Sequence, residues 1–548
     1  MRPRPPSTAP VPATGVAAPV TNYGYDGDGR QVTTTNPDSK TTTTAFNGDN
    51  QVTSVTDAAG NVTTYARDHD GRVTSETDAN SQTASETYNA DGQITSQTDK
   101  DGRVINYAYD HDGRMTQEQW MSGGTAIYTA NWAYDAAGNL TNASDNHSDY
   151  AYTYNSDNMR TQIDNSGTPT GPHVVLNIGY DNMQRQTSLS ATVAGTADFL
   201  NNYSYDAGSD LAQITQQGQT GGNTVAAKLV NFAFDHDGRL TVMSRYADLG
   251  ATQLVAASTY GYDANSNLTS LSQDKGGTNL NSLTWSYDHD GRVTGATSID
   301  GTDGFSYDAA GQVTAATHSY QANESYSFDA TGNRTNTGYS TGTNNQLSSD
   351  GTYNYTYDNA GNLTKKTTIA TGAYVTYTWD YHNRLTDVQA YNSSNVLQSH
   401  EHYVFDVFDR LIEKQVDPTG GGTYTTTQAF VYDNSGNIVL VYNGSGTLTD
   451  RLLNGPGAND ALADENGSAV VSWLLADNEG TIRDVVQYNS GTDTTTIVDH
   501  LKYNSFGVIT SQSNSAYQPL FAYTGQMWDS GAGLYYDQDK EAQRATHD

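Results

Sequence analysis

The stretch that decides the fold reads YAYDHDGRMT and occupies residues 107–116. It contains an aromatic residue, an Asp, a turn centred on Gly, a polar residue and an apolar residue followed by Thr, and this order recurs about eighteen times along the chain. The first five copies follow one another at intervals of 21 residues and begin at Tyr25, Phe46, Arg67, Tyr88 and Tyr109. A fixed period of this length indicates one supersecondary unit that is copied many times.

Each repeat is predicted to be a β-hairpin. Tyr107 and Tyr109 are two residues apart, so on a strand both side chains leave the same face. Asp110 can accept a hydrogen bond from the backbone two residues on, and Gly113 tolerates a positive φ, which together predict a tight turn. β-Branched residues then follow, as in 51–56, and suit a second strand. A lone hairpin is marginal in water, so we expect each copy to be stabilised by its neighbours.

The predicted fold class is therefore all-β, a repeat array of antiparallel hairpins, because helical signals are nearly absent from the repeats. The structural signature of the repeat is predicted at Tyr25, Asp26, Gly29, Tyr109, Asp110, Gly113, Tyr134, Asp135, Gly138, Tyr287, Asp288, Gly291, Tyr357, Asp358 and Gly361.

Bulk composition at first suggests disorder, because aliphatic residues are scarce and the formal net charge is −34. The 39 Tyr and 6 Trp overrule that interpretation, since they recur at repeat positions and offer large surfaces for packing, with Tyr in the place of Leu. The 61 acidic against 27 basic residues repel phosphate backbones and anionic lipids, so neither nucleic-acid nor membrane binding is predicted. A solvated acidic surface is favoured, and a basic partner is the alternative.

The chain has no Cys, which excludes disulfides, thiolate metal sites and a Cys nucleophile. No apolar stretch approaches the ~18 residues of a spanning helix. Residues 1–22 are rich in Pro and Ala and have no apolar core of a signal peptide, so we expect a disordered linker there.

One repeated motif invites a metal-binding interpretation. Asp-His-Asp-Gly-Arg occurs in four copies, which begin at Asp68, Asp110, Asp235 and Asp288. None has the third Asp and the terminal Glu of a calcium loop, so a turn with a solvated His is favoured over weak Ca²⁺ binding at the loop tips.

Two further motifs suggest chemistry. His400 and His402 would share one face of a strand, but without an identifiable third ligand a packing or surface role is favoured over zinc. Residues 417–420 read Asp-Pro-Thr-Gly, for which a hairpin turn is favoured over proteolysis. No pair of carboxylates stands out among the many turn Asp residues. We therefore predict no catalytic, cofactor-binding or metal-binding residue, no cofactor and no enzyme.

The repeats resemble the YD repeats of bacterial Rhs (rearrangement hot spot) proteins and of the teneurin-type shell, over about residues 23–536. Later motifs at 405–414, 475–484, 503–507 and 523–536 resemble the Rhs repeat-associated core domain, in the order of that family. The structural core signature is predicted at Asp477, Gly480, Arg483, Tyr503, Phe506, Gly507, Tyr523, Gly525, Gly533, Leu534 and Tyr535.

The resemblance implies a sheet that spirals into a partial or closed cocoon. It divides the chain into a linker at 1–22, a YD-repeat array at 23–404, an Rhs core domain at 405–536 and a divergent tail at 537–548. In such families the core plugs one end and the shell holds a polymorphic C-terminal toxin until delivery to a neighbouring cell.

The function implied is a non-enzymatic structural shell of an exported bacterial protein, extracellular or at the cell surface, used in interbacterial competition. The implied partner is a toxin or effector domain, in cis or encoded nearby. After Tyr536 the chain departs from the family, because neither an Asp-Pro-x-Gly cleavage motif nor an effector precedes Asp548. The alternatives are a cell-surface adhesin that binds glycans or proteins and, less favoured, a self-cleaving aspartyl protease core.

Overall fold

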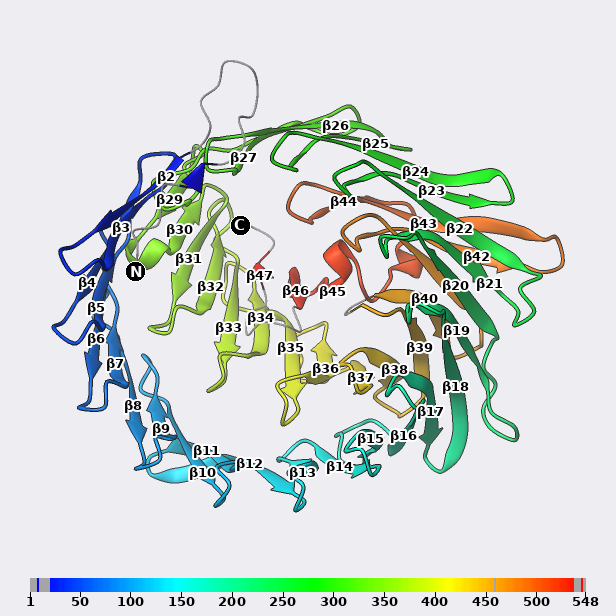
Figure 1. Cartoon of the computed structure of the whole chain (residues 1–548), viewed down its shortest axis with the longest axis horizontal. Helices are drawn as coiled ribbons and strands as arrows, with labels where there is room; N and C mark the ends of the chain where they lie inside the picture. Colours follow the sequence, from blue (N-terminus) through cyan, green and yellow to red (C-terminus); the bar gives the residue numbers. More distant parts are fainter. Residues whose placement is uncertain (1–6, 9–19, 458–459, 537–543, 546–548) are drawn as a thin grey trace. The chain divides into compact units, whose positions relative to one another are not determined.

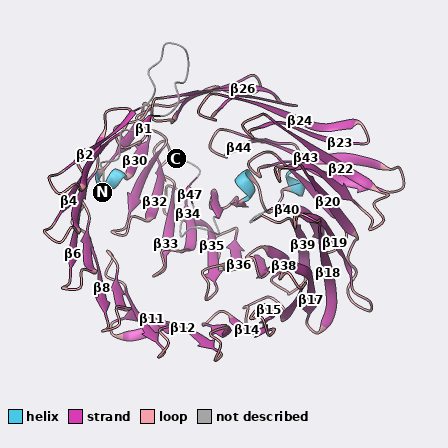
Figure 2. Cartoon of the chain, viewed as in Figure 1, coloured by secondary structure: helices cyan, strands magenta, loops and turns pink. Residues whose placement is uncertain are grey.

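The computed structural model describes residues 7–8, 20–457, 460–536 and 544–545. Among these residues the chain is almost entirely β, as Figure 2 shows by the dominance of strands over three one-turn 3₁₀ helices, η1 (Thr343–Asn345), η2 (Ser515–Tyr517) and η3 (Tyr523–Gly525). The prediction of an all-β hairpin array is confirmed.

The strands run in chain order through Figure 1. The first are β1 (Ser7–Thr8), β2 (Val20–Tyr25), β3 (Gln31–Thr35), β4 (Thr41–Phe46), β5 (Val52–Thr56), β6 (Val62–Arg67), β7 (Val73–Thr77), β8 (Thr83–Tyr88), β9 (Ile94–Thr98), β10 (Val104–Tyr109), β11 (Met115–Ser122) and β12 (Thr125–Tyr134). Next come β13 (Leu140–Ser144), β14 (Asp149–Tyr154), β15 (Arg160–Asn165), β16 (Val174–Tyr180), β17 (Gln186–Val193), β18 (Thr196–Tyr205), β19 (Leu211–Gly218), β20 (Lys228–Phe234), β21 (Leu240–Tyr246), β22 (Leu254–Tyr262), β23 (Leu268–Lys275) and β24 (Thr278–Tyr287).

The later strands are β25 (Val293–Ser298), β26 (Gly301–Tyr307), β27 (Val313–His318), β28 (Glu324–Ser325), β29 (Tyr339–Thr341), β30 (Leu347–Asp350), β31 (Tyr353–Tyr357), β32 (Leu363–Thr368), β33 (Tyr374–Trp379), β34 (Leu385–Tyr391), β35 (Leu397–Phe405) and β36 (Leu411–Asp417). The last are β37 (Thr426–Tyr432), β38 (Ile438–Asn443), β39 (Leu448–Asn454), β40 (Ala461–Asn466), β41 (Val471–Ala476), β42 (Ile482–Asn489), β43 (Thr494–Tyr503), β44 (Ile509–Gln512), β45 (Met527–Asp529), β46 (Leu534–Tyr536) and β47 (Arg544–Ala545).

Strand pairing follows the chain, and each repeat supplies two antiparallel strands. β4 pairs with β5, β5 with β6 and β6 with β7, so one hairpin continues directly into the next. The register shifts by one residue just before the aromatic position, as between Ala45 and Phe46 and between Ala108 and Tyr109. Such a shift is a β-bulge, which bends the strand and increases its twist at every repeat.

The chain forms two compact units. Unit 1 consists of Met1–Thr129, Trp285–Asn383 and Val388–Gln398, and unit 2 of Ala130–Thr284, Arg384–Asp387 and Ser399–Asp548. The domain boundary expected between residues 404 and 405 falls inside β35 and stays a prediction. β2 begins at Val20, inside the expected linker, and apart from Ser7–Thr8 the preceding residues lie outside the described ones, as does most of the expected tail at 537–548.

Unit 2 contains a deep hydrophobic core. Strands β19–β22 and β24 pack against β39–β42, which Figure 1 shows beside them. The buried members of this core are Ile214, Val230, Phe232, Met243, Val255, Ala256, Leu280, Leu453, Leu462, Ala463, Trp473, Leu475 and Val486. Two sheet faces that bury aliphatic side chains against each other form an ordinary sandwich core. The expectation that Tyr replaces Leu is therefore wrong for this core, where Tyr203, Tyr260 and Tyr488 pack only at its margin.

Unit 1 is built differently. No side chain of β2–β9 is fully buried. Contacts between neighbouring strands replace a core, as in the hydroxyl pairs Thr35–Thr41 and Thr77–Thr83, each 2.8 Å apart. Cross-strand Thr pairs stabilise a sheet modestly, so this part of the unit must draw its stability from contacts that recur in every repeat.

Candidate functional site

The turn of each repeat is held by its Asp side chain. Oδ1 of Asp110 accepts hydrogen bonds from the backbone N–H groups of Asp112 and Arg114, both at 2.9 Å, and Oδ2 accepts one from Nε of Arg114 at 2.7 Å. The Arg114 guanidinium lowers the pKa of the Asp110 carboxyl. The same capping pattern holds at the other predicted Asp positions, Asp26, Asp135, Asp288 and Asp358, with Arg or Asn as the partner. The four Asp-His-Asp-Gly-Arg copies are turns of this kind.

The other predicted signature residues also take regular places. The aromatic residues are the last residues of their strands, with Tyr25 ending β2, Tyr109 β10, Tyr134 β12, Tyr287 β24 and Tyr357 β31. The glycines have positive φ, at 79° for Gly29, 83° for Gly113, 89° for Gly138, 78° for Gly291 and 96° for Gly361. A positive φ is the backbone conformation that makes Gly the preferred residue in this turn.

A contact between consecutive repeats, the repeat lock, was not predicted. The Arg239 guanidinium lies 5.0 Å from the ring centre of Tyr262 in the next repeat, and the Tyr262 hydroxyl donates a 2.8 Å hydrogen bond back to the carbonyl oxygen of Leu240. Tyr262 thus receives a cation from the preceding turn and satisfies a carbonyl beside it. Stacking of this kind recurs at Arg30–Phe46, Arg72–Tyr88, Arg185–Tyr205, Arg292–Tyr307, Arg384–Phe405 and Arg410–Tyr432.

Arg67 shows that the hydrogen bond of the lock can form without an aromatic ring. It stands at the aromatic position of its repeat, and its Nε and Nη2 donate to the carbonyl oxygen of Val52, both at 3.3 Å. Tyr88 in the next repeat donates its hydroxyl to the corresponding carbonyl of Val73 at 2.7 Å. A long side chain with a terminal donor therefore suffices for the hydrogen bond. The Arg that ends the turn in several repeats, such as Arg72 and Arg239, was the sequence signal that pointed to the stacking contact.

The predicted core signature forms one cluster in unit 2. The Tyr503 hydroxyl donates to the carbonyl oxygen of Ile482 at 2.9 Å, which repeats the lock, and the buried Tyr535 donates to that of Gly507 at 2.8 Å. A Cβ atom at Gly507 would lie 2.5 Å from the ring of Tyr523, so only Gly fits there. The half-buried Phe506 donates its N–H to Oδ1 of Asn504 in the same turn.

The remaining core residues attach the turn before β42 to the segment after β44. Asp477 caps its turn by accepting N–H groups at 3.0 and 3.1 Å, and burial raises the pKa of its carboxyl to about 6. Arg483 lies 3.9 Å from Asp477 and donates to the carbonyl oxygen of Leu501. Gly480 and Gly525 approach each other, since a Cβ at Gly480 would lie 3.8 Å from the Gly525 nitrogen. Gly533, which has a positive φ, ends the turn between β45 and β46, and the buried Leu534 begins β46.

A buried charged cluster, the hairpin anchor, attaches the β45–β46 hairpin to β35 and β36. The Tyr403 hydroxyl lies 2.7 Å from both Glu401 and Asp529, and Lys414 lies 2.7 Å from Asp529 and 3.1 Å from Glu401. Burial, reinforced by the charge of Asp529, raises the pKa of Glu401. Tyr536 completes the attachment, because its hydroxyl accepts the Leu411 N–H at 3.0 Å.

The hairpin anchor corrects the expectation that no carboxylate pair stands out. Sequence reasoning missed it because Glu401 and Asp529 are far apart in the chain. A second pair, the half-buried Asp450 and Asp464, lies on the adjacent strands β39 and β40, and burial of the carboxyl groups raises the pKa of both.

The two histidines of β35 do share a face, and both contact a residue that sequence reasoning did not identify. Nε2 of His400 and Nδ1 of His402 lie 2.8 and 3.0 Å from the same oxygen of Asp387. This hydrogen bond raises the pKa of His402. Within the described part of the chain no group of three or more His, Asp or Glu residues is arranged to hold a metal ion.

Residues 417–420 form the turn between β36 and β37, as the hairpin interpretation predicted. Asp417 accepts N–H groups from Thr419 at 3.0 Å and from Gly422 at 2.6 Å. Both carboxylate oxygens are used to shape the loop.

The sheet of locked hairpins and its C-terminal cluster define a repeat-built β shell protein. Family models agree: the RHS repeat matches residues 46–83 and 88–119, and the teneurin YD-shell matches 173–347 and 230–542. The chain belongs to the teneurin YD-shell family. Both families are structural shells. Comparison with curated protein sequences finds no match.

Solved structures share the fold. The chain is similar to the TcdB2–TccC3 complex lacking the hypervariable C-terminal region, with 12% identity, a TM-score of 0.55 and coverage of 94% of this chain and 32% of that one. TcdB2–TccC3–TEV has 12% sequence identity and a TM-score of 0.53, over 95% of this chain and 32% of that one. The Tc holotoxin pore of Photorhabdus luminescens has 12% identity and a TM-score of 0.54, over 94% of this chain and 29% of that one. The chain thus spans about a third of the length of the solved chains that it matches. Among the described residues no helix is long and apolar enough to cross a membrane.

Proposed function

We propose that this chain is the non-enzymatic wall of an exported Rhs-type shell, which encloses or presents a C-terminal toxin polypeptide in interbacterial competition. The toxin would be attached in cis or encoded nearby. The observation that carries the proposal is the match of residues 173–347 and 230–542 to the YD-shell, together with a fold shared with Tc toxin structures. The protein would act outside the cell that makes it or at its surface.

The chemistry of the buried charges supports a scaffold. In the hairpin anchor, Lys414 and the Tyr403 hydroxyl engage Glu401 and Asp529, and backbone N–H groups of the final turn also donate to Asp529. Carboxylates occupied in this way fasten one segment to another. The formal net charge of −34 further favours a basic polypeptide as the cargo.

Protease protection tests the proposal. A basic, flexible reporter peptide is fused after Asp548 in one protein and before Met1 in a second, and both are treated with a nonspecific protease. We expect the C-terminal reporter to survive much longer than the N-terminal one, because only the former would be enclosed. Cleavage of both reporters at the same rate would contradict the proposal. In that case we also expect the DNA that follows the codon for Asp548 to encode no toxin.

A further inference from the structure

The hairpin anchor holds the amine of Lys414 against the carboxyl group of Asp529. Nζ of Lys414 lies 2.7 Å from Oδ1 of Asp529. The side chains of Lys414, Glu401 and Asp529 are at most 12% exposed, and Tyr403 beside them is buried. Two groups that are fixed next to each other in this way react as if at a very high concentration. The anchor therefore brings together the two partners of an amide bond.

One of the two carboxyl groups of the anchor carries a proton. Tyr403 has a single hydroxyl proton, yet its oxygen lies 2.7 Å from both Oε2 of Glu401 and Oδ2 of Asp529. That proton can serve only one of the two carboxyl groups, so the other must itself donate to the phenol oxygen. Burial and the charge of Asp529 raise the pKa of Glu401, whereas the charge of Lys414 outweighs burial and lowers the pKa of Asp529. Glu401 is therefore the protonated acid.

Backbone donors already surround the oxygen of Asp529 that would become negative during a reaction. Oδ1 accepts the N–H of Gly531 at 3.0 Å and that of Ala532 at 3.1 Å. Attack on Cγ of Asp529 develops negative charge on this oxygen, and ordered N–H groups stabilise such an oxyanion. The turn can approach Glu401 so closely only with Gly at position 531, since a Cβ atom there would overlap the Glu401 carboxyl group.

We propose that Lys414 and Asp529 form an intramolecular isopeptide bond, with Glu401 as the proton donor and acceptor of the reaction. Lys414 first gives one ammonium proton to Oδ2 of Asp529, and the neutral Nζ then bonds to Cγ. Glu401 protonates Oδ2, which leaves as water, and takes a proton from the nitrogen in return. An ammonium and a carboxylate thus become an amide and one water molecule, and no oxidant or further reactant is required.

Amide formation also removes two charges from a buried site. The ammonium of Lys414 and the carboxylate of Asp529 are held away from water, where each ion carries a desolvation cost. The amide that replaces them is neutral, and its oxygen keeps the two N–H donors of the final turn. The bond links β36 covalently to the β45–β46 hairpin, so the hairpin stays attached even where the surrounding strands loosen. This crosslink does not depend on the proposed shell function.

Mass spectrometry of the full chain under denaturing conditions tests the proposal. We expect the wild-type chain to weigh one water molecule less than its sequence requires, and a tryptic digest to contain a branched peptide that joins Lys414 to Asp529. Lys414→Arg and Glu401→Gln should each have the full mass of their sequence, because the first lacks the attacking amine and the second lacks the acid. The matched control is Lys275→Arg, since Lys275 lies 2.6 Å from Asp493, whose side chain is 71% exposed. This control should keep the mass deficit.

A wild-type chain that has the full mass of its sequence after prolonged incubation at neutral pH would overturn the proposal, and this measurement depends on no variant. A deficit that persists in Lys414→Arg, or a branched peptide that joins Lys414 to another acid, would overturn it as well. Circular dichroism confirms that Glu401→Gln is folded before its mass is compared. Protease protection of a C-terminal reporter measures enclosure and not the crosslink, so failure here is distinct from failure of the shell function.

Discussion

A network of four buried charges in unit 2 predicts that removing its shared carboxylate costs more stability than removing one of its cations. Asp198, Lys228, Arg451 and Glu465 are at most 2% exposed. Arg451 contacts Asp198 at 2.8 Å and Glu465 at 2.5 Å, while Lys228 contacts the other oxygen of Glu465. Glu465 therefore serves two cations, whereas Lys228 has Glu465 as its carboxylate partner and Gln216 as a neutral one at 2.7 Å.

The magnitude follows from the charges left behind. Removing one member of a buried ion pair typically costs about 3–5 kcal/mol. In Glu465→Gln, Lys228 loses the carboxylate that it contacts and Arg451 keeps only Asp198, so we expect a loss of about 5 kcal/mol. In Lys228→Met, Glu465 keeps Arg451, so we expect about 3 kcal/mol. In the ion pair between Lys275 and the exposed Asp493, Lys275→Met should cost less than about 1 kcal/mol and serves as the control.

The pH dependence separates the two variants further. Burial already lowers the pKa of Lys228 to about 8 from its ordinary value of 10.5. Without Glu465 the pKa of Lys228 must fall further, so Lys228 loses its proton in the folded chain while it still holds that proton in the unfolded chain. The unfolded state then binds more protons, and stability rises with pH. Glu465→Gln should thus recover part of its loss between pH 6 and pH 9, a recovery that Lys228→Met cannot show.

Urea unfolding at pH 6, 7.5 and 9 measures these effects. Tryptophan fluorescence reports on the region because Trp473 is 1% exposed in the same core. Comparable losses in both variants, or parallel pH slopes, would refute the assignment of Glu465 as the shared partner of two cations.

Three further predictions use single substitutions. Asp477→Asn keeps a capping oxygen but removes the charge. Burial raises the pKa of Asp477 to about 6, so the stabilising contribution of the protonated carboxyl is present below pH ~3.8 and is lost as pH rises through 6. In urea titrations the variant should therefore be ~1–3 kcal/mol more stable than wild type at pH 7 and no more stable at pH 4. Gly29→Ala should cost ~1–2 kcal/mol of stability because of its positive φ alone. Gly507→Ala should cost a further ~1–3 kcal/mol, because its new methyl group would clash with the ring of Tyr523. Equal thermal midpoints for the two variants would exclude the clash. The hydrogen bond that the His402 imidazole donates to Asp387 raises the pKa of His402, so its stabilising contribution is full below pH ~6.5 and fades above it. His402→Gln should flatten the stability profile between pH 6 and 8, and an unchanged profile would rule this out.

The repeat could be predicted from sequence because its chemistry is local. Asp110 and Gly113 shape one turn within four residues, and this pattern suffices to define the strands on either side. The repeat lock needs the register between neighbouring hairpins, so Arg239 and Tyr262 could be paired only once that register was known. The resemblance in turn predicted the C-terminal core motifs, whose residues do assemble in unit 2.

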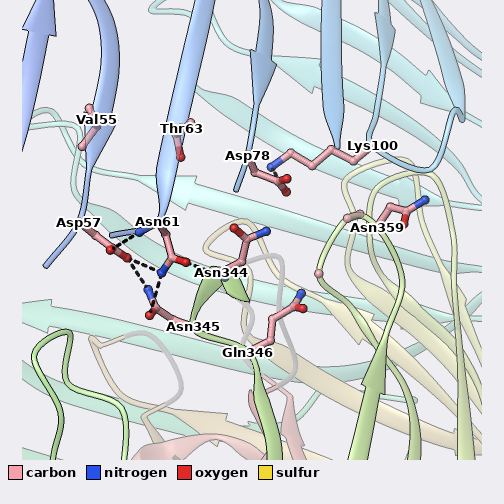
Figure 3. Close-up of a pocket in the computed structure, with 12 residues that line it drawn as sticks. Val55, Asp57, Asn61, Thr63, Asp78, Lys100, Asn344, Asn345, Gln346 and Asn359 are labelled. Carbon is pink, nitrogen blue, oxygen red and sulfur yellow. Dashed lines mark hydrogen bonds and ion pairs between the residues drawn. The ribbon is translucent and has the colours of Figure 1, made fainter. Parts of the chain in front are cut away.

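What could not be predicted depends on contacts between distant segments. Lys228 and Glu465 are 237 residues apart, and neither lies in a motif. The hydrogen bond between the side chains of Asn61 and Asn345 likewise joins positions 284 residues apart (Figure 3). Asp387 was missed as the partner of His400 and His402 because it lies on the neighbouring strand β34, where no spacing rule links it to them.

The same turn motif stabilises the two units in different ways. Where the turn is solvated, as at Asp110, an Arg four residues on neutralises the carboxylate. Asp477 is only 13% exposed on its side chain and has Thr481 in the Arg position, so its charge is poorly compensated. In β2–β9, where no side chain is fully buried, stability is carried by contacts between neighbouring repeats, and the loss of one lock should remain local. In the unit 2 core, buried charges connect strands from distant parts of the chain, so a single substitution there should weaken both sheet faces together.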